Sequence, residues 1–302
     1  MGLAMKILIT GASGQLGNEL RRLLETGRAE IGVIPDEYKA AEVVYTDTPQ
    51  LDITDESAVQ ELVSSGNFDL VINCAAMTNV DGCESNEELA DLVNRQGAIN
   101  VAQACANKGI PVVHVSTDYV FSGTEAGERV ESDKTAPISA YGRTKLAGEI
   151  GVAEANPKHH IIRTAWLYGY VGNNFAKTML KLAENHDHVT VVDDQLGNPT
   201  SANDLAYEVL KIALTDDYGV WHATNEGTCS WADFAEAVLA DTDCRVERCT
   251  SEEYKNAHPD SASRPAFSSL RNKRLEDTIG NEMRSWQDAL NAYMENLPKF
   301  EN

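Results

Sequence analysis

The N-terminal half of the chain alternates between short apolar runs and longer segments in which apolar residues recur every three or four positions. The short runs are rich in β-branched residues, as buried strands are, and they cover residues 6–10, 43–47, 70–74 and 112–117. The longer segments predict helices at 18–25, 56–64 and about 87–108. Strands that alternate with helices through short links predict an α/β fold with a doubly wound parallel sheet.

The pattern changes after a helix that begins near Ser139 and a strand at 161–165. Beyond it we expect helices at 176–183, 204–214, 231–239 and 286–297, and strands at 189–192, 219–224 and 244–249. The change predicts a larger domain of residues 1–165 plus about 187–226, and a smaller C-terminal α/β lobe of about 166–186 plus 227–302. Residues 28–42, which include Pro35, are expected to form an inserted loop or an extra strand.

Charge and cysteine content narrow the range of partners. The chain of 302 residues carries a formal net charge of −22, which would repel nucleic acid and an anionic membrane. An anionic ligand would need a local basic pocket. The six cysteines form no CxxC pair and are expected to be reduced thiols, and we expect no metal site. Because no apolar run approaches the roughly 20 residues of a membrane span, we expect a cytoplasmic protein.

A glycine motif, Gly11-Ala-Ser-Gly14-Gln-Leu-Gly17, follows the first strand and opens the first helix. In a dinucleotide-binding turn the first glycine allows the tight turn, the second lets the backbone approach a pyrophosphate, and the third lets helix pack on strand. The free N–H groups of the helix N-terminus then face the anion. The sequence therefore predicts a Rossmann-like domain with cofactor contacts from Gly11, Ser13, Gly14, Gln15, Leu16 and Gly17.

An acidic residue usually ends the second strand of such a domain and binds the adenosine ribose, about 20 residues beyond the glycines. Here the spacing is longer, and Asp47 at the strand end is the better candidate, with Asp52 in the following turn. Asp47 would favour NADH by repelling a 2′-phosphate. Asp52 could equally be the N-cap of the helix at 56–64. Both NADH and NADPH stay open as cofactors.

Ligands of a doubly wound sheet bind at the carboxyl ends of its strands. Ala75 and Ala76 follow the third strand, and Ser116, Thr117 and Asp118 lie at the end of the fourth. We expect the two alanines to lie against the cofactor. The Thr117 hydroxyl could hydrogen-bond a substrate oxygen.

Two Tyr-x-x-x-Lys patterns fall in predicted helices, Tyr141 with Lys145 and Tyr207 with Lys211. A spacing of four places both side chains on one helix face. A neighbouring ammonium favours the phenolate and moves the pKa of a tyrosine toward neutrality, where it can exchange a proton. Only the first pair accompanies a glycine motif and the strand-end Thr117. We therefore interpret Tyr141 and Lys145 as catalytic, and the second pair as core and surface.

Motifs along nearly the whole chain, in order, resemble those of the dTDP-4-dehydrorhamnose reductases, which are extended short-chain dehydrogenases/reductases. They are the glycine motif, Asn73-Cys-Ala-Ala-Met-Thr-Asn-Val-Asp-Gly-Cys-Glu84, Ser116-Thr-Asp-Tyr-Val-Phe-Ser-Gly123, Tyr141-Gly-Arg-Thr-Lys-Leu-Ala-Gly-Glu149, Arg163-Thr-Ala-Trp-Leu-Tyr168, Gly172-Asn-Asn-Phe-Ala-Lys177, Asp194-Gln-x-Gly-x-Pro-Thr200 and Arg264-Pro265. The long 28–42 segment departs from the common pattern of this family.

The resemblance implies NAD(P)H-dependent reduction of dTDP-4-dehydro-β-L-rhamnose at C4 to dTDP-L-rhamnose. Tyr141 would donate the proton, Lys145 would hold the nicotinamide ribose and lower the tyrosine pKa, and Thr117 would orient the carbonyl. Further cofactor contacts would come from Thr78 and Ser116. Candidate nucleotide-sugar contacts are Asp118, Trp166, Asn174, Lys177 and Arg264. The resemblance is compatible with a homodimer and leaves open whether an ion lies at a subunit interface.

Other interpretations stay open. A dehydratase of this fold carries a glutamate after the strand-end Thr-Asp, where this chain has Tyr119, and this difference speaks against dehydration. An epimerase uses the same Tyr, Lys and Thr, and a regulatory subunit could bind a dinucleotide without catalysis. Trp166 could be a core aromatic, Arg264 a surface arginine paired with an acid, and Asn94 either a satisfied buried amide or a supporting residue behind the site.

Overall fold

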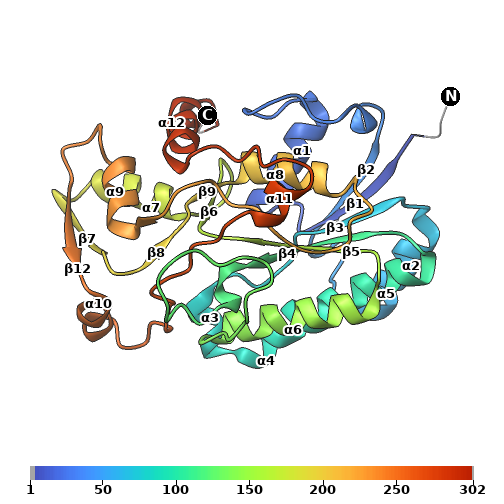
Figure 1. Cartoon of the computed structure of the whole chain (residues 1–302), viewed down its shortest axis with the longest axis horizontal. Helices are drawn as coiled ribbons and strands as arrows, with labels where there is room; N and C mark the ends of the chain where they lie inside the picture. Colours follow the sequence, from blue (N-terminus) through green and yellow to red (C-terminus); the bar gives the residue numbers. More distant parts are fainter. Residues whose placement is uncertain (1–3, 301–302) are drawn as a thin grey trace.

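A computed structural model describes residues 4–300 (Figure 1). Its centre is a six-stranded parallel sheet with the order β10-β5-β4-β3-β1-β2. The strands are β1 (Lys6–Thr10), β2 (Glu42–Thr46), β3 (Leu70–Asn73), β4 (Val112–Thr117), β5 (His159–Thr164) and β10 (Gly219–His222). The predicted α/β fold with a doubly wound parallel sheet is confirmed.

The direction of the crossovers reverses at β1. Thr10, the last residue of β1, pairs with Thr46 of β2 on one side and with Asn73 of β3 on the other. The carboxyl ends of strands at such a switch point leave a crevice for a ligand. The glycine motif follows directly from this point.

Alternate strand residues fill the two faces of the sheet. Ile7 and Ile9 belong to one hydrophobic core and Leu8 to another. Figure 1 shows α1 and α8 above the sheet, and α2, α5 and α6 below it. These helices are α1 (Gln15–Thr26), α8 (Ala202–Ile212), α2 (Glu56–Gly66), α5 (Ala98–Lys108) and α6 (Ala140–Ala155). Burial on both faces explains why the strands read as continuous apolar runs.

The helix predicted at 87–108 is continuous, but its hydrogen bonding changes in the middle. It consists of α4 (Glu87–Asp91), a π-helical turn η2 (Leu92–Gly97) and α5. A Cβ placed on Gly148 of α6 would lie 2.2 Å from the carbonyl oxygen of Asn94. The glycine therefore lets α6 approach the backbone of the π turn, and such turns often occur at functional sites.

Residues 28–41 form a loop with the short 3-10 helix η1 (Asp36–Tyr38), β2 begins at Glu42, and the segment adds no further strand to the central sheet. Tyr38 is 1 % exposed, and its hydroxyl donates to the carbonyl oxygen of Leu210 in α8 at 2.8 Å. The Glu30 carboxylate lies 2.6 Å from the guanidinium of Arg284. The loop thus joins α8 to the C-terminal part of the chain.

A second hydrophobic core lies beside the central sheet, on the left in Figure 1. We expected residues 187–226 to belong to the larger domain. However, β7 (His188–Val192) pairs in parallel with β12 (Arg245–Cys249), and Val189 and Val191 pack in the second core with Phe234. Only the later part of that range, α8 and β10, packs with the central sheet.

The remaining elements are shorter or belong to this lobe. They are α3 (Val80–Ser85), α7 (Phe175–Ala183), α9 (Trp231–Val238), α10 (Ser251–Ala257), α11 (Lys273–Asp277), α12 (Trp286–Asn296), the 3-10 turns η3 (Asp118–Val120) and η4 (Leu297–Lys299), and the two-residue strands β6 (Leu167–Tyr168), β8 (Leu196–Gly197), β9 (Thr200–Ser201) and β11 (Cys229–Ser230). The six cysteines are free thiols. Within residues 4–300, no helix is both long and apolar enough to cross a membrane.

Candidate active site

A cavity of about 870 Å³ opens at the carboxyl ends of the central strands and extends to the smaller lobe. Seventeen of the residues predicted for the site line it: Gly11, Gly14, Gln15, Leu16, Gly17, Asp47, Asp52, Ala75, Ala76, Thr78, Ser116, Thr117, Asp118, Tyr141, Lys145, Trp166 and Asn174. Ser13, Lys177 and Arg264 do not line it. Residues that are distant in the sequence therefore meet in one space.

The glycine loop packs closely against neighbouring backbone only because Gly11 and Gly17 lack side chains. Gly11 has a φ of +65°, and a Cβ there would lie 2.5 Å from the backbone nitrogen of Ala75. A Cβ on Gly17 would lie 2.5 Å from the Gly11 carbonyl oxygen. The N-cap of α1, Gly14, supplies no side-chain hydrogen bond, and the first turn holds no acid. The helix N-terminus thus keeps N–H groups that suit an anion, as a dinucleotide pyrophosphate requires.

Asp47 supports the glycine loop as well as lining the cavity. Its Oδ2 accepts a hydrogen bond from the backbone N–H of Ser13 at 2.8 Å, and its Oδ1 accepts one from Thr48 at 2.8 Å. Ser13 thus contributes to the loop through its backbone.

The alternative that Asp52 is the N-cap of α2 is wrong, because Asp55 occupies that position. Asp55 caps α2 through the N–H of Ala58 at 3.0 Å, whereas Asp52 accepts hydrogen bonds from the backbone and hydroxyl of Thr54.

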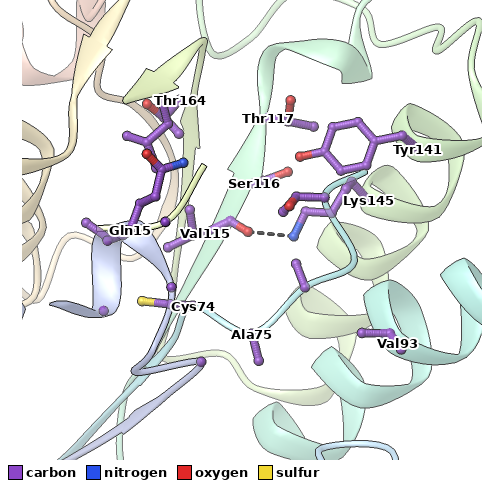
Figure 2. Close-up of a pocket in the computed structure, with 18 of the residues that line it drawn as sticks. Gln15, Cys74, Ala75, Val93, Val115, Ser116, Thr117, Tyr141, Lys145 and Thr164 are labelled. Atoms are coloured by element: carbon purple, nitrogen blue, oxygen red, sulfur yellow. Dashed lines mark hydrogen bonds between the residues drawn. The ribbon is translucent and has the colours of Figure 1, made fainter. Parts of the chain in front are cut away.

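Tyr141 and Lys145 lie one turn apart on α6, whose N-cap Ser139 accepts a hydrogen bond from Gly142. Figure 2 shows both side chains directed toward the end of β4. The Lys145 ammonium donates to the carbonyl oxygen of Val115 at 2.6 Å and lies 3.5 Å from Nε2 of His114. Burial lowers the pKa of Lys145 to about 8. Its charge therefore changes within the range in which enzymes work.

The environment of Tyr141 differs from the expectation that a neighbouring cation would lower its pKa. Burial raises the pKa of Tyr141, and the Thr117 hydrogen bond only opposes that effect. The Lys145 ammonium is directed at the Val115 carbonyl instead. Removal from water is the largest cause of the shift, so the phenol stays protonated at neutral pH.

Thr117 and Asp118 form a buried pair beside the tyrosine. The Thr117 hydroxyl donates to Oδ1 of Asp118 at 2.8 Å, while Oδ2 has no hydrogen-bond partner among the described residues. Burial raises the pKa of Asp118 to about 7. A carboxyl group that is close to neutral and has a free oxygen suits a hydroxyl group of a ligand.

An aromatic wall closes the side of the cavity that the smaller lobe forms. Trp166 has a φ of 46°, an unusual value for a bulky residue, and its ring stacks on Trp231 at 3.6 Å with an angle of 7°. A Cβ on Gly197 would lie 2.4 Å from the Trp166 ring. Strained backbone that packing holds in place is typical of functional sites.

Trp231 also lines the cavity, and sequence reasoning missed it. It lies 65 positions beyond Trp166 at the start of α9, and nothing in its local pattern distinguishes it from a core aromatic.

Fewer basic side chains line the cavity than the sequence predicts. Asn174 caps α7 and donates to Oε1 of Gln15 at 3.2 Å, so it joins the lobe to the glycine loop. Lys177 donates to the carbonyl oxygen of Tyr170 at 2.5 Å, and Arg264 forms an ion pair with Asp81 at 3.1 Å. Within residues 4–300, Lys145 is the only Lys or Arg that lines the cavity.

Asn94 is a satisfied buried amide that also supports the site. Its side chain accepts a hydrogen bond from the N–H of Met77 at 2.8 Å and donates to the carbonyl of Met77 at 3.0 Å and to the Thr144 hydroxyl at 3.2 Å. It therefore fixes the segment after β3 against α6.

A group of apolar residues that line the cavity was also missed. Leu51, Ile53, Val80, Leu89, Leu92 and Val93 line it. Leu89 and Leu92 are each 44 % exposed. The available signal was a pair of leucines three positions apart among the acidic residues Glu87, Glu88 and Asp91. Among the described residues, no group of three His, Cys, Asp or Glu side chains could hold a metal ion.

Comparison with known proteins agrees with this geometry. The family model described as RmlD substrate binding domain matches residues 5–298. A dTDP-4-dehydrorhamnose reductase of Sinorhizobium fredii is 38 % identical over 94 % of this chain and 95 % of its own length.

Two crystal structures have the same fold. A dTDP-4-dehydrorhamnose reductase of Clostridium acetobutylicum has a TM-score of 0.90 and 45 % identity, over 97 % of this chain and 100 % of that one. A dTDP-4-dehydrorhamnose reductase of Bacillus anthracis, in complex with NADP, has a TM-score of 0.89 and 36 % identity, again over 97 % and 100 %. The chain belongs to the dTDP-4-dehydrorhamnose reductase family.

Proposed function

We propose that this protein is an NAD(P)H-dependent dTDP-4-dehydrorhamnose reductase, which reduces the C4 keto group of dTDP-4-dehydro-β-L-rhamnose to give dTDP-L-rhamnose. The observation that carries the proposal is the convergence of Tyr141, Lys145 and Thr117 with the glycine loop in one cavity. Membership in the family supports a nucleotide sugar as the substrate. A cytoplasmic location and a homodimer are predictions that accompany this proposal.

The residues of the cavity fit a dinucleotide. The glycine loop and the N-terminus of α1 would hold the pyrophosphate, and Ala75 and Ala76 would lie against the cofactor. Asp47 and Asp52 would bind the adenosine ribose. When bound, the reduced nicotinamide supplies the hydride.

Tyr141 would supply the proton. Because burial raises the pKa of Tyr141, the phenol stays protonated until negative charge develops on the C4 oxygen. Lys145 would then stabilise the phenolate that forms and hold the nicotinamide ribose. Its ammonium already donates to the Val115 carbonyl, which limits its positions.

Thr117 and Asp118 would orient the sugar. The Thr117 hydroxyl now donates to Oδ1 of Asp118 at 2.8 Å. To donate to the C4 oxygen instead, the hydroxyl must rotate away from that carboxylate oxygen. The free Oδ2 of Asp118 is available for a sugar hydroxyl. Trp166 would pack against the hexose.

The diphosphate of the substrate needs positive charge, and Lys145 is committed to the reaction centre. We propose Arg264 as the diphosphate contact, which requires it to exchange Asp81 for the phosphate. Asn174 and Lys177 are weaker candidates, because both are already bonded within the lobe.

A dehydratase is less compatible with the site. It would need a glutamate after Asp118, and the residue there is the buried Tyr119. No glutamate lines the cavity among the described residues.

The test is the absorbance of the reduced nicotinamide while the protein is supplied with dTDP-4-dehydro-6-deoxyglucose, with and without the 3,5-epimerase that forms the L-sugar, and with NADH and NADPH in turn. We expect oxidation only with the epimerase, and dTDP-L-rhamnose as product. Absence of oxidation in every combination, by protein that still binds dinucleotide, would overturn the proposal and favour a binding subunit.

A further inference from the structure

The face of α6 that carries Tyr141 and Lys145 continues to a third polar residue, Glu149. The three residues are spaced by four, so they lie on one face of the helix. They meet three consecutive residues at the end of β4. Tyr141 is hydrogen-bonded to Thr117, Lys145 donates to the Val115 carbonyl at 2.6 Å, and Glu149 accepts from the Ser116 hydroxyl at 2.5 Å. The function proposed above uses the first two contacts and leaves Glu149 without a role.

Glu149 is fully enclosed and firmly held. Glu149 and Arg163 are each 4 % exposed, and the guanidinium donates to both carboxylate oxygens, at 2.9 Å and 2.7 Å. Arg163 lies in β5 directly before Thr164 and Ala165, which line the cavity. A buried ion pair is weak evidence for stability, because apolar residues of the same size often serve as well. Its position behind the reaction centre therefore calls for another explanation.

Several titratable groups face Lys145 from the surrounding elements. Tyr141 and Glu149 lie on α6 itself, His114 on β4, Cys74 after β3 and Cys83 on α3. Burial keeps His114 neutral by lowering its pKa, and raises the pKa of the Cys83 thiol and that of the Cys74 thiol to about 12. Asp118, which is close to Tyr141, is itself near neutral. Glu149 is thus the leading group that opposes loss of the Lys145 charge.

We propose that Glu149, held by Arg163, is a positioning residue of this active site: it keeps Lys145 in the ammonium form and fixes Ser116, and with it the end of β4, against α6. A neutral amine would accept as readily as donate, and it could no longer stabilise a phenolate. The catalytic consequence rests on the function proposed above, but the charge of Lys145 can be measured without turnover.

The direct test is an NMR titration of the Lys145 side chain through its ¹³Cε shift in protein without cofactor, assigned by loss of the signal in Lys145→Arg. We expect Glu149→Gln to lower the midpoint of the titration by about one pH unit, as loss of a nearby opposite charge does. The matched control is Glu154→Gln, the same substitution at an exposed position of α6, which should leave the midpoint unchanged. An unchanged midpoint in Glu149→Gln would overturn the proposal.

Glu149→Gln leaves Arg163 buried without a counter-charge and could fail to fold. The double variant Glu149→Gln, Arg163→Gln removes both charges and keeps hydrogen-bonding groups. We expect it to lower the Lys145 midpoint as well, because Glu149 is the leading group that opposes loss of the Lys145 charge. If both folded variants titrate like the wild type, Glu149 has only a structural role.

A second measurement links the charge to catalysis. The alkaline limb of the kcat/KM profile should move to lower pH in Glu149→Gln by the same amount as the NMR midpoint, and stay in place in Glu154→Gln. If the wild type turns over no nucleotide sugar, the proposed function fails, while the NMR titration still decides the role of Glu149. A limb that stays in place while the midpoint moves would overturn the catalytic part of the proposal.

Discussion

The chain contains the same Tyr-x-x-x-Lys spacing twice, in α6 and in α8, and the two copies have different surroundings. Tyr141 and Lys145 line the cavity at the carboxyl ends of the strands, and Lys145 donates to a backbone carbonyl there. Tyr207 is 8 % exposed in the hydrophobic core above the sheet, and the Lys211 ammonium lies 3.3 Å from Glu282 and 5.6 Å from the Tyr207 ring. The spacing sets which side chains share a face, and the element that this face meets decides whether they can act.

The position along the helix explains much of the difference. Tyr141 is the second residue of α6, so its ring emerges where the helix begins, next to the strand ends. Tyr207 is in the middle of α8 and packs against the glycine at position 32 in the 28–41 loop. Burial raises the pKa of both tyrosines, to about 12 for Tyr207. A raised tyrosine pKa therefore does not identify the catalytic copy, whereas the cavity does.

The largest effect should follow loss of the Tyr141 hydroxyl. Tyr141→Phe removes the proposed proton donor and keeps the aromatic ring, whose centroid lies 5.7 Å from that of the Tyr119 ring. We expect kcat to fall roughly 10²- to 10⁴-fold, the usual contribution of general acid catalysis. Steady-state rates measure this, and NADPH affinity by titration calorimetry should stay within a few-fold of wild type. A kcat near that of wild type would contradict the claim that Tyr141, unlike Tyr207, is the proton donor.

Removal of the Lys145 ammonium should have the next largest effect. Lys145→Met keeps a buried chain of similar length but loses the donor to Val115. A hydrogen bond from a charged group contributes about 1.5–3 kcal/mol, so kcat/KM should fall roughly ten- to a hundredfold. The matched control, Lys211→Met in α8, should keep the wild-type kcat/KM. Equal losses in the two variants would show that the lysines act only through stability.

The pH dependence should follow the Lys145 charge. Because its pKa is lowered to about 8, the ammonium is present below that pH and is lost above it. We expect kcat/KM, which reports the free enzyme, to fall roughly tenfold between pH 7 and pH 9. The raised pKa of Tyr141 adds no loss in this range. A flat profile up to pH 10, in protein that circular dichroism shows to be folded, would contradict this role.

A smaller effect should come from the aromatic wall of Trp166 and Trp231, which lines the same cavity as Tyr141. Trp231→Ala removes the ring that stacks on Trp166 at 3.6 Å. Aromatic pairs contribute about 0.5–1.5 kcal/mol, so the KM for the nucleotide sugar should rise roughly two- to tenfold with less change in kcat. Trp231→Phe, which keeps an aromatic ring, should lie closer to wild type. If Trp231→Ala binds the sugar like wild type, the wall has no part in substrate binding.

Local pattern was sufficient to predict the central sheet and the glycine loop. The inner strands β1, β3, β4 and β5 are buried along most of their length, which favours the apolar runs that predict them. Gly11 and Gly17 stand where a Cβ would lie 2.5 Å from backbone atoms, so these two positions require glycine. Serine favours the N-cap position, so Ser139 predicts where α6 begins, and in the structure Ser139 does cap this helix. These features depend on neighbours along the chain.

Features that depend on distant packing could not be predicted in the same way. Trp231 reaches the cavity only because α9 docks beside Trp166, and Arg264 is turned to Asp81 across 183 positions. The strand β7 lies in the smaller lobe and not in the central sheet, because it pairs with β12. The direction of the Tyr141 pKa shift was wrong for the same reason, because the sequence shows a nearby lysine but not how far the phenol is removed from water.

The most direct test of the account compares Tyr141→Phe with Tyr207→Phe in one assay of reduced-nicotinamide oxidation, at saturating NADPH and nucleotide sugar. The two variants lose the same atom from the same motif, in helices of one molecule. We predict that Tyr207→Phe keeps the rate of wild type, while Tyr141→Phe falls below it by at least roughly a hundredfold. Equal rates in the two variants would contradict the assignment of Tyr141 as the proton donor.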